Sequence, residues 1–85
     1  MRRAKKVKAL ANFLLLIQFD NGENRVYNCF PLLQNPLFEA LNEESVFQSV
    51  YVDEMGVVCW NASMDINPYD LYEKSEPVTD FAFAG

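Results

Sequence analysis

The sequence predicts an α+β fold: a small antiparallel sheet, made of a three-stranded meander plus a hairpin, with two short helices in the order βββ-α-ββ-α. Two runs of alternating apolar residues flank Asp20-Asn21-Gly22-Glu23, and Asn-Gly between such runs is a hairpin signal. Asn-Pro occurs twice, at Asn35-Pro36 and at Asn67-Pro68. Because asparagine caps a helix and proline at the first helical position loses no hydrogen bond, each pair predicts a helix start.

The meander occupies the N-terminal third of the chain. We expect a first strand over residues 6–11, with Ala11-Asn12 as its turn. The second strand leads to Asn21-Gly22, which supplies the two positive-φ residues of a type I′ turn. The third strand follows over residues 26–30 and ends at Pro31.

Side chains of the second strand alternate between two faces. One face carries Phe13, Leu15, Ile17 and Phe19, and the other carries Leu14, Leu16 and Gln18. Successive strand residues point to opposite sides of a sheet, so the first set belongs to the core. Leu14 and Leu16 then give the outer face an apolar character, and we expect a helix or a partner to cover them.

A helix and a second hairpin follow the meander. The helix starts at Asn35-Pro36 and runs for about two turns, with Leu37, Phe38 and Leu41 crowding one side. The alternation over residues 46–52 predicts a strand, residues 53–56 form a loop with Gly56 at the positive-φ place, and residues 57–60 form the return strand.

The last helix follows Trp60 after a short joint. Asn67 caps it, Pro68 starts it, and Asp70 and Lys74 suit the positive and negative ends of the helix dipole. We expect Trp60 to close the core against this helix and the Asp65 carboxylate to bond backbone N–H groups of the joint. The alternative is a ligand site around Trp60 and Asp65.

Charge divides the chain unevenly. The net charge is −5, yet five of the seven basic residues lie within the first eight positions: Arg2, Arg3, Lys5, Lys6 and Lys8. The remainder holds two basic residues against twelve acidic ones, a balance of −10. We expect a basic arm over 1–5, a single domain over 6–75 and an apolar tail over 76–85. The body would repel a nucleic-acid backbone, so only the basic residues could attract one.

Several function classes lack their chemistry. The chain has no histidine, so neither a Ser-His-Asp nor a Cys-His arrangement can form, and its three glycines are too far apart for a phosphate-binding loop. Cys29 and Cys59 lie in apolar surroundings and read as reduced, buried thiols, with a disulfide between them left open. We expect no enzyme, no cofactor and no metal site.

A membrane location is not predicted either. The apolar run over residues 9–17 is far short of the roughly 20 residues of a membrane helix. Lys8 adjoins it, and no small-residue cleavage site follows, which argues against a secretory signal. The sequence therefore indicates a cytoplasmic protein.

The order of motifs resembles a small bacterial family, domain of unknown function 2442, similar in fold to a domain fused to a helix-turn-helix in some larger proteins. The matching stretches are FDNGENRVYN (19–28), PLLQNPLFEAL (31–41), VFQSVYVDEMGVVCW (46–60) and DINPYDLYEKS (65–75). Asn28 stands where the family has an acid, and residues 61–64 lack its glycine. The resemblance implies neighbouring genes of toxin–antitoxin type, and hence a partner.

These observations predict a non-enzymatic protein-interaction module of a toxin–antitoxin-like or regulatory pair. The alternative is a nucleic-acid-associated regulator that binds through its basic N-terminal residues; a homodimer formed by edge-strand pairing also stays open. The tail could dock on the body, pair with a sheet edge or engage a partner. The candidate interaction or ligand surface consists of Leu14, Leu16, Trp60, Asp65, Phe81 and Phe83.

Overall fold

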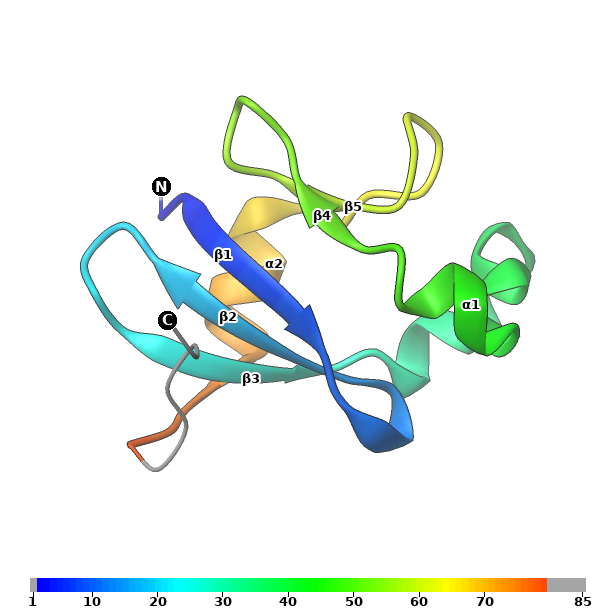
Figure 1. The fold of residues 1–85 in the computed structure, drawn as a ribbon, viewed down its shortest axis with the longest axis horizontal. Helices are drawn as coiled ribbons and strands as arrows, with labels where there is room; N and C mark the ends of the chain where they lie inside the picture. Colours follow the sequence, from blue (N-terminus) through cyan, green and yellow to red (C-terminus); the bar gives the residue numbers. More distant parts are fainter. Residues whose placement is uncertain (1, 80–85) are drawn as a thin grey trace.

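The computed structural model describes residues 2–79, and it confirms the predicted α+β class. One antiparallel sheet has the strand order β1-β2-β3-β6, and β4 and β5 form a separate hairpin (Figure 1). The strands are β1 (Ala4–Ala9), β2 (Leu14–Phe19), β3 (Asn24–Asn28), β4 (Tyr51–Val52), β5 (Val58–Cys59) and β6 (Glu76–Pro77). The helices are α1 (Glu44–Phe47), α2 (Pro68–Lys74) and the 3-10 helices η1 (Ala11–Phe13), η2 (Phe30–Gln34) and η3 (Pro36–Asn42).

The core lies on one side of the four-stranded sheet. In Figure 1, α2 lies behind β2 and β3, and the β4–β5 hairpin lies next to β1. Leu15 and Ile17 of β2 are fully buried, and they join a cluster that includes Leu71 of α2. The alternation predicted for the second strand is therefore confirmed for its inner face.

The sheet begins and ends with residues that the sequence did not place in it. The first strand starts at Ala4, two residues before the predicted start. The predicted tail opens with β6, in which Glu76 lies opposite Val26 of β3. Pro77 fits this edge strand, because an edge position does not need its missing N–H group. Phe81 and Phe83 lie outside the described residues.

The turn between β2 and β3 is not the predicted type I′ turn. The N–H of Gly22 donates to the carbonyl oxygen of Phe19 (2.9 Å), and the N–H of Phe19 donates to that of Glu23 (2.9 Å). These bonds close a three-residue loop in which Gly22 has φ 87° and Asn21 does not have positive φ. Asn21 instead accepts the N–H of Glu23 through its side chain (3.0 Å), as turn asparagines commonly do.

Among the described residues other than glycine, positive φ occurs in the turn between β1 and β2. Asn12 and Phe13 have φ values of 62° and 61°. Such a conformation costs an L-residue roughly 1–2 kcal/mol, and an aromatic residue rarely adopts it. The ring of Phe13 packs edge-on against those of Phe47 (5.5 Å between centroids) and Phe30 (6.3 Å). These contacts offset the strain of the turn.

The helix predicted at Asn35-Pro36 is present, but it is the 3-10 helix η3. Its cap is the predicted one, since Oδ1 of Asn35 accepts the N–H of Leu37 (3.0 Å). Phe38 and Leu41 are buried, whereas Leu37 is 54% exposed, so the expectation that Leu37 packs beside them was wrong. With three residues per turn, a 3-10 helix places residues i and i+3 on one side.

The second hairpin is shorter than predicted. Val46 and Phe47 belong to α1 and not to a strand, so the predicted two-faced alternation over residues 46–52 was wrong there. The N–H groups of both residues donate to the carbonyl oxygen of Glu43 (3.0 Å), which forms a helical turn and buries Phe47. Burial of one aromatic ring thus overrides the strand pattern.

The predictions for Gly56 and Asn67 are confirmed. Gly56 has φ 80°, and it closes the β4–β5 loop through its N–H to the carbonyl oxygen of Asp53 (3.0 Å). Asn67 caps α2, because its Oδ1 accepts the N–H of Tyr69 (2.9 Å) and of Asp70 (3.3 Å).

Candidate functional site on the outer face of the sheet

Four side chains form a row across the sheet on the face that points away from the core. Lys8 lies opposite Leu16, Leu16 opposite Val26, and Val26 opposite Glu76. Directly opposed residues of antiparallel strands share a face, and the neighbours of Leu16 along β2 point into the core. The row therefore has a cation at the β1 edge, a carboxylate at the β6 edge and two apolar side chains between them.

Val26 and Glu76 of this row also line an apolar groove. It encloses about 470 Å³, and its floor and walls are formed mainly by aliphatic side chains. The lining residues are Leu10, Leu14, Val26, Asn28, Lys74, Glu76 and Val78. They come from four segments, and backbone hydrogen bonds join Leu10 to Leu14 (2.8 Å) and Val78 to Asn24 (2.9 Å). We call this surface the outer groove.

The structure separates the two leucines that were predicted together. Leu14 is half-buried and lines the outer groove. Leu16 also projects from the outer face, but its side chain is only 2% exposed and does not line the groove. Of this pair, Leu14 is the side chain that a partner can reach.

Sequence reasoning missed three aliphatic residues of the outer groove: Leu10, Val26 and Val78. Val26 carried a usable signal, because alternation along the third strand places it on the face opposite to buried Tyr27. Val78 joins the groove only because its N–H donates to the carbonyl oxygen of Asn24 (2.9 Å) beside β6. No local sequence pattern predicts a strand as short as β6, which has two residues.

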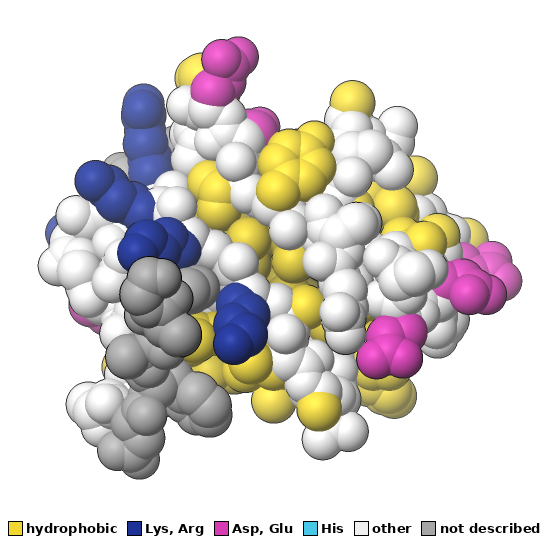
Figure 2. Space-filling model, viewed as in Figure 1, with side chains coloured by type: hydrophobic (Ala, Val, Ile, Leu, Met, Phe, Trp, Pro, Cys, Tyr) yellow, Lys and Arg dark blue, Asp and Glu magenta, His cyan; other side chains and the backbone are white. Residues whose placement is uncertain are grey.

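The five basic residues of the N-terminal segment lie on β1 and just before it. In Figure 2, Lys and Arg side chains gather over the start of β1, whereas acidic side chains lie at the β4–β5 loop and near α1. Arg2 pairs with Asp20 at 3.3 Å, with the Arg2 side chain 47% exposed. By the register of β1, Lys6 and Lys8 project from the outer face, since Val7 between them packs on the core.

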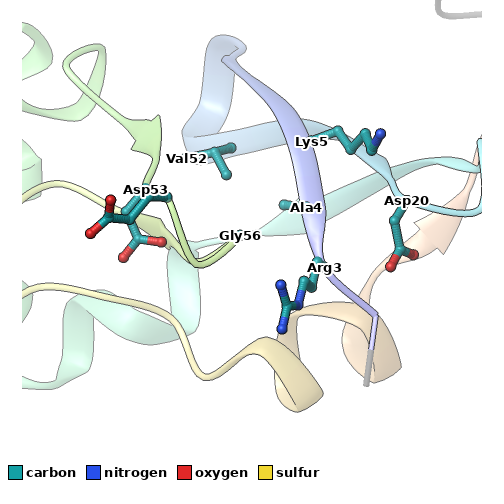
Figure 3. A pocket seen from close by; sticks show the side chains of 8 residues that line it. Arg3, Ala4, Lys5, Asp20, Val52, Asp53 and Gly56 are labelled. Atoms are coloured by element: carbon teal, nitrogen blue, oxygen red, sulfur yellow. The ribbon is translucent and has the colours of Figure 1, made fainter.

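Arg3 and Lys5 have acidic neighbours. They line a hollow of about 350 Å³ together with Asp20, Asp53 and Glu54. Figure 3 shows Asp53 on the side of the β4–β5 hairpin and Asp20 on the other side of β1, with Arg3 between them. The negative charges nearby partly offset the positive potential of these two basic residues.

Trp60 is part of the core. It is 6% exposed, its indole N–H donates to the carbonyl oxygen of Phe47 (2.9 Å), and its ring contacts Phe38 and Phe47 at centroid distances of 6.4 and 6.1 Å. Both partners precede it in the chain, whereas we expected the following helix. The buried N–H and the covered ring leave no face for a stacked ligand.

Asp65 is exposed, and its backbone forms a bridge with Cys59. The joint before α2 is held by asparagine side chains instead. Oδ1 of Asn61 accepts the N–H groups of Ser63 (2.8 Å) and Met64 (2.9 Å). The role expected of Asp65 thus belongs to Asn61. An asparagine side chain commonly accepts the backbone N–H two residues further on, so Asn61 itself was the sequence signal for this turn.

Cys29 and Cys59 are free and buried. Burial raises the pKa of the Cys29 thiol to about 12. A thiol protonated at neutral pH is neither a nucleophile nor a ready metal ligand. Within residues 2–79, no three His, Cys, Asp or Glu side chains gather closely enough to hold a metal ion. Among the same residues, no helix is long and apolar enough to span a membrane.

Comparison with known proteins identifies a family. A family model described as "Protein of unknown function (DUF2442)" matches residues 4–77, which include every described strand and helix. No curated protein and no solved structure matches the chain.

Proposed function

This chain belongs to the DUF2442 family, and we propose that it is a non-enzymatic, cytoplasmic protein-interaction module of a toxin–antitoxin-like or regulatory pair. The observation that carries this proposal is the outer groove, where Leu14 and Val26 line an apolar hollow of about 470 Å³ on the sheet's outward face. The paired-gene part follows from the gene neighbours that the family resemblance implies.

The outer groove has the composition of an interface. One face of an antiparallel sheet is normally polar when it faces water, so aliphatic residues there need a reason. Apolar surface rimmed by polar groups marks interaction sites, and the rim here consists of Asn28, Lys74 and Glu76. The two buried, unpaired cysteines are in keeping with a reducing compartment.

The test is co-expression of the tagged full chain with the products of its adjacent genes. Leu14→Asp places a charge in the outer groove and should abolish recovery of the partner. Leu37→Asp is the matched control, because Leu37 is an exposed leucine on η3, outside the groove. Recovery of a partner by the native chain and Leu37→Asp, but not by Leu14→Asp, supports the proposal.

Two results contradict it. One is that no adjacent gene product is recovered with the native chain. The other is equal recovery with both variants, which would exclude the outer groove as the interface. Circular dichroism of both variants checks that the fold is retained.

A specific observation favours the alternative, a regulator that binds nucleic acid. Lys5, Lys6 and Lys8 are exposed on one strand, next to Arg2 and Arg3. Binding of this kind weakens steeply with salt, and removal of residues 1–3 together with Lys5→Glu, Lys6→Glu and Lys8→Glu should abolish it. Fluorescence anisotropy with labelled DNA and RNA at low salt measures it, and absence of binding there removes this alternative.

A further inference from the structure

Resting on the proposed function, we infer that the outer groove receives an acidic, amphipathic segment of a partner protein. Its apolar side chains would enter between Leu14 and Val26, and its carboxylates would face Lys8 and Lys74.

The described charges on the outer face of the sheet are mainly positive. Among residues 2–79, Lys6, Lys8 and Lys74 project from this face or line its groove, and the carboxylate that lines the groove is that of Glu76. The rest of the chain is strongly acidic, with a balance of −10 after residue 8. The outer face is therefore a local positive region on a negative protein. Complementary charge steers association and disfavours partners of the wrong sign.

The acidic residues near β1 lie at its start and not at the outer groove. Arg3 and Lys5 share a hollow with Asp20, Asp53 and Glu54, so acids offset their charge. Those three acids do not line the outer groove. An anionic partner consequently finds its complement at Lys8 and Lys74 and not at the start of β1.

The side chains that line the groove favour a protein ligand over a nucleic acid. The groove's apolar members are Leu10, Leu14, Val26 and Val78, with no aromatic ring among the described lining residues. Single-stranded nucleic acids bind on aromatic rings, and duplex backbones bind to cations without an apolar hollow between them. Aliphatic pockets flanked by lysines suit leucine- or valine-like side chains followed by Asp or Glu.

The probe is a short synthetic peptide in which Leu and Glu alternate. It is titrated into the ¹⁵N-labelled full chain and followed by backbone amide NMR. We expect chemical-shift changes at Leu14, Val26 and Val78. A peptide with Ser in place of Leu, and one with Lys in place of Glu, should cause none. Affinity should fall at high salt, because the Debye length shortens from about 10 Å at 0.1 M to about 3 Å at 1 M.

Matched charge reversals test the lysine. Lys8 lies on the same face as the groove, opposite Leu16. Lys8→Glu should weaken peptide binding by about fivefold or more, since it replaces an attractive charge beside the groove with a repulsive one. Lys5→Glu makes the same change three residues earlier on β1, in the hollow shared with Asp20, Asp53 and Glu54, and should change the affinity by less than about twofold. Equal effects of the two variants would overturn the inference, because they would report net charge only.

Three further outcomes would overturn it. They are tighter binding of the Lys-containing peptide, displacement of the peptide by oligonucleotides, and peptide binding only after removal of residues 80–85, which would assign the groove to this chain's own C-terminus. The proposed function fails separately. If Leu14→Asp releases the co-expressed partner while Lys8→Glu retains it, the interaction module stands and the acidic character of its partner is wrong.

Discussion

The guanidinium carbon of Arg25 lies 4.4 Å from the centroid of the Tyr72 ring. The same guanidinium donates to the hydroxyl (2.7 Å) and the carbonyl oxygen (2.6 Å) of Ser75, and to the carboxylate of Glu23 (2.8 Å). Arg25 is on β3, whereas Tyr72 and Ser75 lie at the end of α2. This cluster, the Arg25 clamp, therefore fixes α2 to the sheet directly before β6 and holds Lys74 and Glu76 in place at the outer groove.

Arg25→Lys should lower the free energy of unfolding by about 2 kcal/mol. Lysine keeps the charge, but it cannot reproduce a planar donor group that serves Ser75 twice and Glu23 once. Hydrogen bonds to charged groups contribute about 1.5–3 kcal/mol, and the side chain of Arg25 is only 13% exposed. Urea denaturation followed by the fluorescence of Trp60 measures the change.

Arg2→Lys is the control for Arg25→Lys. Arg2 also pairs with a carboxylate, Asp20, but its side chain is 47% exposed. Exposed pairs contribute about 0–1 kcal/mol, so this variant should be close to the native chain. Equal losses in the two variants would contradict the importance assigned to the Arg25 clamp.

The Arg25 clamp should also make the free energy of unfolding depend on pH. The bonds from the Tyr72 hydroxyl and from Arg25 hold the pKa of Glu23 below its ordinary value of 4.5. The unfolded chain binds that proton more readily, so the carboxylate stabilises the fold above pH 4.5, and this contribution is lost as the pH falls through the lower folded-state pKa.

Glu23→Gln should therefore be less stable than the native chain at pH 7, with a difference that shrinks as the pH falls below 4.5. Urea denaturation at a series of pH values measures it. Tyr72→Phe removes one donor to the same carboxylate and should reproduce part of the effect. A difference that stays constant from pH 7 to pH 3 would show that Glu23 acts without its charge.

Local chemistry was readable from the sequence where one residue determines the conformation. Asn67-Pro68 starts α2 and Gly56 closes its loop, because capping and positive φ are properties of those residues alone. The inner face of β2 was equally readable, since alternation with period two has one interpretation when Leu15 and Ile17 face a core.

The rest depends on distant contacts. The ring of Phe13, a residue with positive φ, packs on Phe47 and Phe30. Phe47 is helical where its ring is buried and its carbonyl oxygen accepts the indole N–H of Trp60. At the outer groove, the sequence identified Leu14 but missed Val78, which depends on pairing between β6 and β3. Such tertiary pairings override local propensity and leave no local signal.

Gly56→Ala should destabilise the protein more than Gly22→Ala. Both glycines have positive φ, 80° and 87°, so both variants incur the cost of about 1 kcal/mol for a left-handed alanine. A Cβ on Gly22 meets nothing within 4 Å, whereas one on Gly56 lies 2.7 Å from Cβ of Arg3. We expect a loss of about 1 kcal/mol for Gly22→Ala and about 2–4 kcal/mol for Gly56→Ala.

Thermal unfolding of the two glycine variants measures this difference. Amide exchange at Ala4 gives a second readout, because its N–H donates to the carbonyl oxygen of Gly56 (3.0 Å). That amide should exchange faster in Gly56→Ala and stay protected in Gly22→Ala. Equal losses of stability would mean that β1 and the β4–β5 loop are not in the close contact described.

The Cys29 thiol should report opening of the fold. It is fully buried, and burial raises its pKa to about 12, so at pH 8 the folded chain offers an aromatic disulfide reagent neither access nor thiolate. In a Cys59→Ala background, labelling should therefore proceed only through opening of the fold, at a rate set by the open fraction.

Adding Arg25→Lys should accelerate this labelling about 30-fold if the clamp contributes about 2 kcal/mol to the opening that exposes Cys29, because each 1.4 kcal/mol is a factor of ten. Labelling as fast in the folded as in the urea-denatured chain would contradict the buried position of Cys29.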